Sequence, residues 1–194
     1  LGIVYNVPIT VASSFTAGPG TLIHKGANMD IRVGEIRNRV RGIAADTNVA
    51  KVTVLGLVDR PGVAARLFEA LSGADISVDV IVQNASVDGA TDLTFTVKGN
   101  DLDRALELVE KAAGILGSRG VETADHLAKV SIVGTGMLDA PGYAAKMFRA
   151  LADIDANIEM ITTSEIRITC IVEDTKVGEA ARALHAAFEL EQSA

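Results

Sequence analysis

The 194-residue sequence has one cysteine, no tryptophan and only 4% aromatic residues. A single cysteine excludes an intramolecular disulfide framework and fits a reducing compartment. Lys and Arg number 18 against 25 Asp and Glu, and the resulting net charge of −7 argues against a nucleic-acid partner. No apolar run approaches the roughly 20 residues of a membrane span, and no basic segment typical of a signal peptide opens the chain. We therefore expect a cytoplasmic protein with no nucleic-acid and no membrane partner.

Residues that would carry catalysis or hold a metal are also scarce. The three histidines do not have the spacing of metal ligands, so we expect no metal site. Cys170 alternates with Ile168 and Val172, which indicates a packed strand position and not a nucleophile. Residues 134–136 lack the full dinucleotide-binding pattern and predict a loop. No catalytic residue is expected in this chain.

The most informative positive feature is an internal repeat. The segment Lys-Val-Thr-Val-Leu-Gly at residues 51–56 recurs as Lys-Val-Ser-Ile-Val-Gly at 129–134. The Pro-Gly segment at 61–71 recurs at 141–151, and Ser-Val-Asp-Val-Ile at 77–81 matches Asn-Ile-Glu-Met-Ile at 157–161. The offset changes from 78 to 80 to 75 residues, so the length differences fall between the matched segments, as expected of loops.

Each copy predicts the order β-α-β-β-α-β. Asp59, as N-cap, and Pro61 open the first helix, Gly73 ends it, and an Asp-Gly hairpin turn lies at residues 87–90. The expected strands and helices of the first copy are strands at 52–57, 76–82, 93–97 and 121–123, and helices at 59–72 and 101–113. This order predicts an α+β protein of two tandem ferredoxin-like βαββαβ domains, with antiparallel sheets and helices on one face.

Residues 1–48 lie outside the repeat. They predict a strand at 8–15, a turn at 18–20 and a second short strand at 20–23, whereas the pattern at 31–45 fits a strand or a helix. We expect three parts: a leader or linker at 1–48, a first domain at 49–125 and a second domain at 126–194.

The combination of a strand, Asp-x-Pro-Gly and an Ala-Ala-x-x-Phe-x-Ala-Leu helix resembles the ACT domain, a sensor of small molecules. The arrangement of two such units in one chain is similar to the regulatory region of aspartate kinase (aspartokinase). Val-Gln-Asn-Ala-Ser at 82–86 resembles that family's first regulatory domain, and the segment 157–168 with Ser-Glu-Ile-Arg resembles its second. The leader resembles the end of the kinase domain and its linker. The chain departs from the family at Ser77 and at 139–140.

The resemblance implies either the separate regulatory (beta) subunit or the C-terminal regulatory region of aspartate kinase. That enzyme converts ATP and L-aspartate to 4-phospho-L-aspartate, the first step of lysine, threonine and methionine biosynthesis. The effectors would be threonine, lysine or both, bound between ACT domains for feedback inhibition. The implied partners are a second copy, forming a homodimer through the ACT domains, and a catalytic (alpha) subunit. No cofactor is expected on this chain, because ATP and Mg would belong to a kinase domain that it lacks, and the chain alone should be inactive.

A free amino acid needs a carboxylate for its ammonium group and N–H donors for its carboxylate, and a helix N-terminus supplies such donors. The segment from Asp59 to Ala64 offers both. By resemblance, one wall of the effector site would consist of Asp59, Pro61, Gly62, Val63, Ala64 and Gln83, with Ser86 nearby. The other wall, from a partner copy, would consist of Asn157, Ile158, Thr163 and Glu165. Gln83 would contact the effector side chain, and Glu165 would pair with lysine.

Simpler roles for these residues remain open at this stage. Asp59 can be an N-cap only, and Gly62 and Gly142 can be ordinary turn glycines. Glu165 and Arg167 can form a cross-strand pair without any ligand. The whole chain can be a purely structural dimerisation module, and an independent enzyme is the alternative with the least support from the sequence.

Overall fold

The computed structural model describes residues 9–11, 21–23, 40–84, 88–135, 137 and 141–190. Contacts divide the chain into two units, residues 1–37 and 38–194. In the first, β1 (Ile9–Val11) pairs with β2 (Thr21–Ile23) in antiparallel register, with Val11 opposite Thr21. This pairing confirms the two predicted leader strands, and the predicted turn between them lies outside the described residues.

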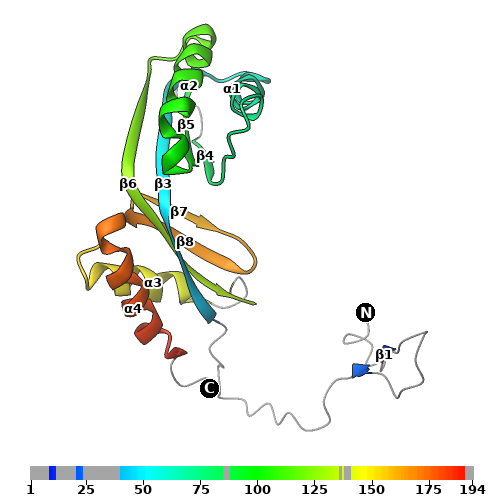
Figure 1. The fold of residues 1–194 in the computed structure, drawn as a ribbon, viewed down its shortest axis with the longest axis vertical. Helices are drawn as coiled ribbons and strands as arrows, with labels where there is room; N and C mark the ends of the chain where they lie inside the picture. Colours follow the sequence, from blue (N-terminus) through cyan, green and yellow to red (C-terminus); the bar gives the residue numbers. More distant parts are fainter. Residues whose placement is uncertain are drawn as a thin grey trace. The chain divides into compact units, whose positions relative to one another are not determined.

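The second unit is built on one six-stranded antiparallel sheet in the order β4-β5-β3-β6-β8-β7, with four α-helices packed against it (Figure 1). The predicted α+β fold class is confirmed. The strands are β3 (Val40–Val58), β4 (Ile81–Gln83), β5 (Ala90–Val97), β6 (Gly120–Gly134), β7 (Met160–Thr163) and β8 (Arg167–Glu173). The helices are α1 (Val63–Ser72), α2 (Leu102–Leu116), α3 (Tyr143–Ala152) and α4 (Val177–Ala187), with 3-10 turns Gly99–Asp101 and Asp174–Lys176 before α2 and α4.

The first half packs α1 and α2 on β3, β4, β5 and β6. Val63, Leu67 and Leu71 of α1 recur at the predicted helical spacing and are buried. They contact a core that includes Val52 and Phe95, both 0% exposed. Burial of one stripe of a short helix against a sheet is what holds such a helix in place.

The second half repeats this arrangement with α3 and α4 on β6, β7 and β8, but it takes its fourth strand from elsewhere. The N-terminal part of β3 pairs with the C-terminal part of β6, with Ala44 opposite Ser131 and Val40 opposite Gly134. Val40 is buried in the core of the second half. Residues 40–45, for which the sequence allowed strand or helix, are therefore a strand that completes the second half of the sheet.

The two long strands β3 and β6 run through both halves, as Figure 1 shows. The predicted boundaries after residues 48 and 125 stay predictions, because the sheet itself is continuous across them. Among the described residues, no helix is long and apolar enough to cross a membrane.

Two predicted details of the first half are wrong. The strand expected at 76–82 is regular only at Ile81–Gln83, although Asp79 N–H still donates to Thr96 O at 3.1 Å. The N-cap of α1 is Gly62, with φ 91° and no side-chain cap, so Asp59 does not cap the helix. Asp59 lies four positions before Val63, the first helical residue, and this is too far from the first turn for an N-cap.

Candidate functional site

A cavity of about 360 Å³ opens where β3 ends and α1 begins. It is lined by the six described residues that the sequence placed on the first wall, Asp59, Pro61, Gly62, Val63, Ala64 and Gln83. Leu57, Val58, Arg60, Thr91 and Leu93 also line it and were not predicted. The volume lies in the range of small-molecule sites.

The backbone between β3 and α1 shapes this cavity. Asp59 N–H donates to Gly89 O at 2.9 Å, which ties the turn to the hairpin between β4 and β5. Gly62 has φ 91°, and a Cβ built on it would meet no atom within 4 Å. The left-handed conformation therefore requires glycine, and the space above it stays open. Gly62 is therefore a turn glycine, as the simpler alternative proposed. The absence of a side chain at this position also leaves room for a ligand.

The N-terminus of α1 carries no charge compensation of its own. It has no acidic residue in its first turn and no side-chain cap. The unpaired N–H groups and the dipole of a helix N-terminus favour an anion such as a carboxylate. Asp59 is exposed beside this end and lines the same cavity. Complementary groups for a carboxylate and an ammonium therefore lie in one place.

Strand pairing brings the remaining lining residues to the cavity. Gln83 pairs with Leu93 across β4 and β5, and Leu57 pairs with Thr91 across β3 and β5. The Thr91 hydroxyl donates to Asn84 O at 2.8 Å and so ties β5 to the residue that follows β4. The sequence signal for Leu93 was the alternation of residues 93, 95 and 97, which indicated only a strand; Thr91 lay outside that pattern. Ser86 lies outside the described residues.

The second predicted wall lies in the other half of the sheet. Asn157 is exposed, and its amide Nδ2 donates to Glu159 Oε1 at 3.2 Å. Lys51 Nζ donates to Glu159 Oε2 at 2.6 Å, and this bond together with the lysine charge lowers the pKa of Glu159 from its ordinary value. Ile158 is half-buried against the core of the second half.

Thr163 and Glu165 lie at the far end of β7. Thr163 is the last residue of β7 and lines a second cavity of about 230 Å³ with Gly142 and Ala144, at the N-terminus of α3. Glu165 lies in the turn closed by Ser164 N–H donating to Arg167 O at 2.7 Å. Because Glu165 is in the turn and Arg167 begins β8, they are not cross-strand neighbours, and in the described part of the chain no ion pair joins them.

One copy of the chain does not bring the two walls together. The cavity at α1 contains only residues of the first half, and the cavity at α3 only residues of the second. β4 and β7 are the opposite edge strands of the sheet. Gln83 of the first wall and Thr163 of the second therefore lie on edge strands that can pair with another chain.

The remaining chemistry-bearing residues are packed or solvated. Cys170 is 0% exposed, and burial raises the pKa of its thiol to about 12, so it does not act as a nucleophile at neutral pH. Within the residues that the structure describes, no three His, Cys, Asp or Glu side chains gather in a way that could hold a metal ion.

Comparison with known proteins gives consistent results. The model of the ACT domain matches residues 52–113 and 130–188. An aspartate kinase of Pseudomonas fluorescens is 45% identical over 190 residues, which cover 98% of this chain and 45% of the relative. The chain thus spans about half the length of the full enzymes that it matches.

Two solved structures are similar over nearly their whole length. The regulatory subunit of aspartate kinase from Thermus thermophilus, in its ligand-free form, is 41% identical with a TM-score of 0.72. The match covers 77% of this chain and 99% of that one. A structure of aspartokinase alpha and beta subunits contains a chain that is 42% identical, also with a TM-score of 0.72, covering 78% of this chain and 99% of that chain.

The repeated βαββαβ unit and the match of the family model define a protein with two ACT domains, and the chain belongs to the ACT domain family. More particularly, its two domains are regulatory ACT domains of the aspartokinase type.

Proposed function

We propose that this chain senses threonine, lysine or both as end products of an aspartate kinase pathway and confers feedback inhibition on the kinase. The observation that supports this proposal most strongly is the cavity at α1, where Asp59 lies beside an uncompensated helix N-terminus. The ammonium of an α-amino acid would bind the Asp59 carboxylate, and its carboxylate would accept N–H groups of the first turn of α1. Gln83 would contact the side-chain hydroxyl or amine.

The complete site would include a second copy of the chain. Asn157, Ile158, Thr163 and Glu165 of the partner copy would supply the second wall, with Glu165 pairing with the side chain of lysine. The exposure of Ile81 (52%) on β4 and Ile161 (44%) on β7 favours a homodimer that covers these edge strands. Each dimer would then hold two equivalent sites.

Inhibition would follow from linkage between effector binding and domain arrangement. An effector that binds one arrangement more tightly shifts the equilibrium toward it by its differential affinity. The solved relative that contains alpha and beta subunits supports a catalytic subunit as the partner through which this shift acts. ATP and Mg would bind to that catalytic part, where aspartate is phosphorylated, and this chain alone would have no kinase activity.

Calorimetric titration of the chain with threonine and with lysine tests this function. Asp59→Asn should weaken binding by roughly tenfold or more, because a charge-assisted hydrogen bond contributes about 1.5–3 kcal/mol. Asp75→Asn is the matched control: Asp75 is exposed in the same half, lies outside the cavity and has φ 59°, which asparagine tolerates. Absence of binding heat with either amino acid would contradict the proposal.

The exposed edge strands also favour a second candidate, a structural dimerisation module without an effector. Sedimentation equilibrium in the absence and presence of both amino acids separates the two. A dimer that forms without binding any amino acid supports the structural module, whereas a dimer whose stability increases with effector supports the sensor.

A further inference from the structure

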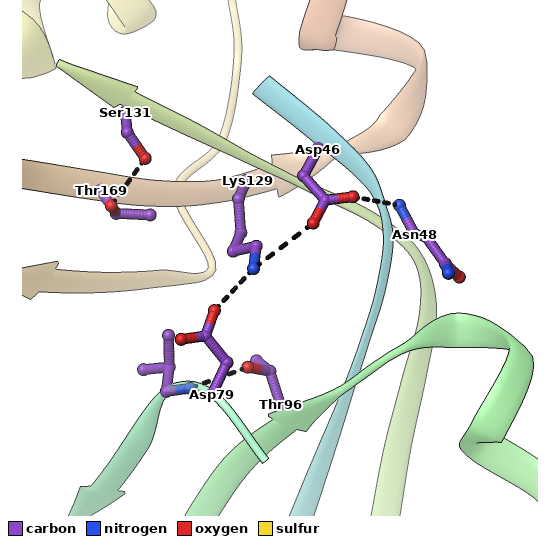
Figure 2. Close-up of polar contacts among 8 residues, drawn as sticks. Asp46, Asn48, Asp79, Thr96, Lys129, Ser131 and Thr169 are labelled. Atoms are coloured by element: carbon purple, nitrogen blue, oxygen red, sulfur yellow. Dashed lines mark hydrogen bonds and ion pairs between the residues drawn. The ribbon is translucent and has the colours of Figure 1, made fainter. Parts of the chain in front are cut away.

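Two lysine–carboxylate ion pairs on the helix-free face of the sheet join the two halves reciprocally. Lys51 Nζ lies 2.6 Å from Glu159 Oε2, and Lys129 Nζ lies 2.6 Å from Asp79 Oδ2, as Figure 2 shows for the second pair. In the sequence repeat, Lys51 is equivalent to Lys129, and Asp79 is equivalent to Glu159. Each half of the chain therefore contributes a lysine that binds a carboxylate of the other half of the same chain.

These ion pairs flank a small apolar cluster of Val49, Val80, Leu127 and Ile171. Val49 belongs to this cluster whereas its neighbour Ala50 belongs to the core under α1 and α2. Successive strand residues point to opposite faces, so the cluster lies on the face away from the helices. The two halves thus meet through both apolar and charged contacts.

The two lysine side chains are mostly buried, so each ammonium group is partly removed from water beside its carboxylate. The Lys51 side chain is 20% exposed and that of Lys129 is 23% exposed. Lys129 has a second carboxylate, Asp46 Oδ2, at 3.5 Å, whereas Glu159 is the one carboxylate within 4.0 Å of Lys51 in the described residues. A partly buried ammonium that loses its carboxylate keeps its desolvation cost, which makes the Lys51–Glu159 pair the sharper one to test.

Each carboxylate lies within a few residues of a wall residue of the candidate site: Glu159 follows Asn157 by two residues, and Asp79 precedes Gln83 by four. Glu159 accepts the amide of Asn157, and its N–H donates to Ile171 O at 2.8 Å. Asp79 N–H donates to Thr96 O in the equivalent place, four residues before Gln83. A lysine of one half therefore binds a carboxylate whose own backbone is hydrogen-bonded next to a wall of the other half.

We propose that Lys51, through Glu159, is a positioning residue for the effector wall at Asn157, and that the reciprocal Lys129–Asp79 pair couples this wall to the cavity at α1. The proposal rests on the proposed function. In a dimer whose sites combine one wall from each chain, the two walls of a single chain belong to two different sites. The reciprocal ion pairs then link the two sites, so that ordering one wall lowers the cost of ordering the other.

The test compares effector titrations of the wild-type chain with Lys51→Met, Lys51→Arg and Glu159→Gln. We expect Lys51→Met and Glu159→Gln to weaken binding by about fivefold or more, within the usual range of coupling between sites, and to lower the Hill coefficient toward one. Lys51→Arg should bind within about twofold of wild type, because it restores a cation. Lys111→Met, which removes an exposed lysine of α2, is the matched control and should leave binding unchanged.

A second readout keeps this proposal separate from the proposed function. The side-chain amide signal of Asn157, followed by NMR in the effector-free chain, should shift in Lys51→Met and stay near its wild-type position in Lys51→Arg. If wild type binds no amino acid, the proposed function fails and the NMR shift alone decides the positioning role. Wild-type affinity in Lys51→Met, or an unmoved Asn157 signal in that folded variant, overturns the proposal.

Discussion

Replacing Gly62 by alanine tests the backbone conformation that opens the candidate site. Gly62 has φ 91° and ψ −8° as the N-cap of α1, and a Cβ there would meet no atom within 4 Å. The cost of Gly62→Ala is therefore conformational and not steric. A left-handed conformation costs a residue with a Cβ about 1–2 kcal/mol, so the free energy of unfolding should fall by about that amount.

Gly114→Ala is the matched control for this change. Gly114 is an exposed residue of α2 with ordinary helical φ, and a Cβ there also meets nothing within 4 Å. The same chemical change should therefore stabilise the chain by about 0.5–1 kcal/mol, because glycine is the poorer helix former.

Urea denaturation of the two variants and wild type measures both effects. A loss of 1 kcal/mol should also lower the Tm by about 2–4 °C for a protein of this size. Opposite signs for the two alanine variants, with unchanged m values, support the account. A Gly62→Ala variant as stable as wild type would refute it, because the positive φ would then not be enforced by the fold.

Three further predictions concern burial and charge. Cys170, fully buried with a thiol pKa raised to about 12, should not react with a thiol reagent at pH 8 until the chain unfolds, which a timed alkylation with and without urea measures. Because the pKa of Glu159 is lowered in the folded chain, its contribution is complete above the ordinary value of 4.5 and is lost as the pH falls through the folded pKa. The stability difference between wild type and Glu159→Gln should accordingly shrink below about pH 4.5 in urea titrations, and a constant difference would be inconsistent with this ion pair. Phe95→Ala should lower the free energy of unfolding by about 3–5 kcal/mol, because Phe95 is 0% exposed and packs edge-on against Phe68 with ring centroids 5.2 Å apart. A loss below about 1 kcal/mol in urea denaturation would show that this core is wrongly described.

The sequence was sufficient for the repeated unit because its signals are local. The stripe of Val63, Leu67 and Leu71 and the Asp-Gly turn, where Asp88 has φ 53° and Gly89 has φ 77°, specify a helix and a hairpin within a few residues. All described members of the first predicted wall line one cavity for the same reason, since five of the six lie within residues 59–64.

The features that the sequence did not predict depend on long-range pairing. Residues 40–45 look ambiguous alone and become a strand only because β6 offers them a partner from a distant part of the chain. The equivalence of Lys51 with Lys129 was visible in the repeat, but the exchange of partners between the halves was not. Strand pairing and ion pairing between distant segments leave no periodic signal in the sequence.

The most direct test of the central claim is a crystal structure of this chain grown with threonine and lysine. The account predicts an amino acid whose ammonium contacts Asp59 and whose carboxylate accepts N–H groups of the first turn of α1, with Asn157 of a second copy on its other side. An amino acid bound elsewhere, or crystals with this cavity empty at saturating effector, would contradict the account.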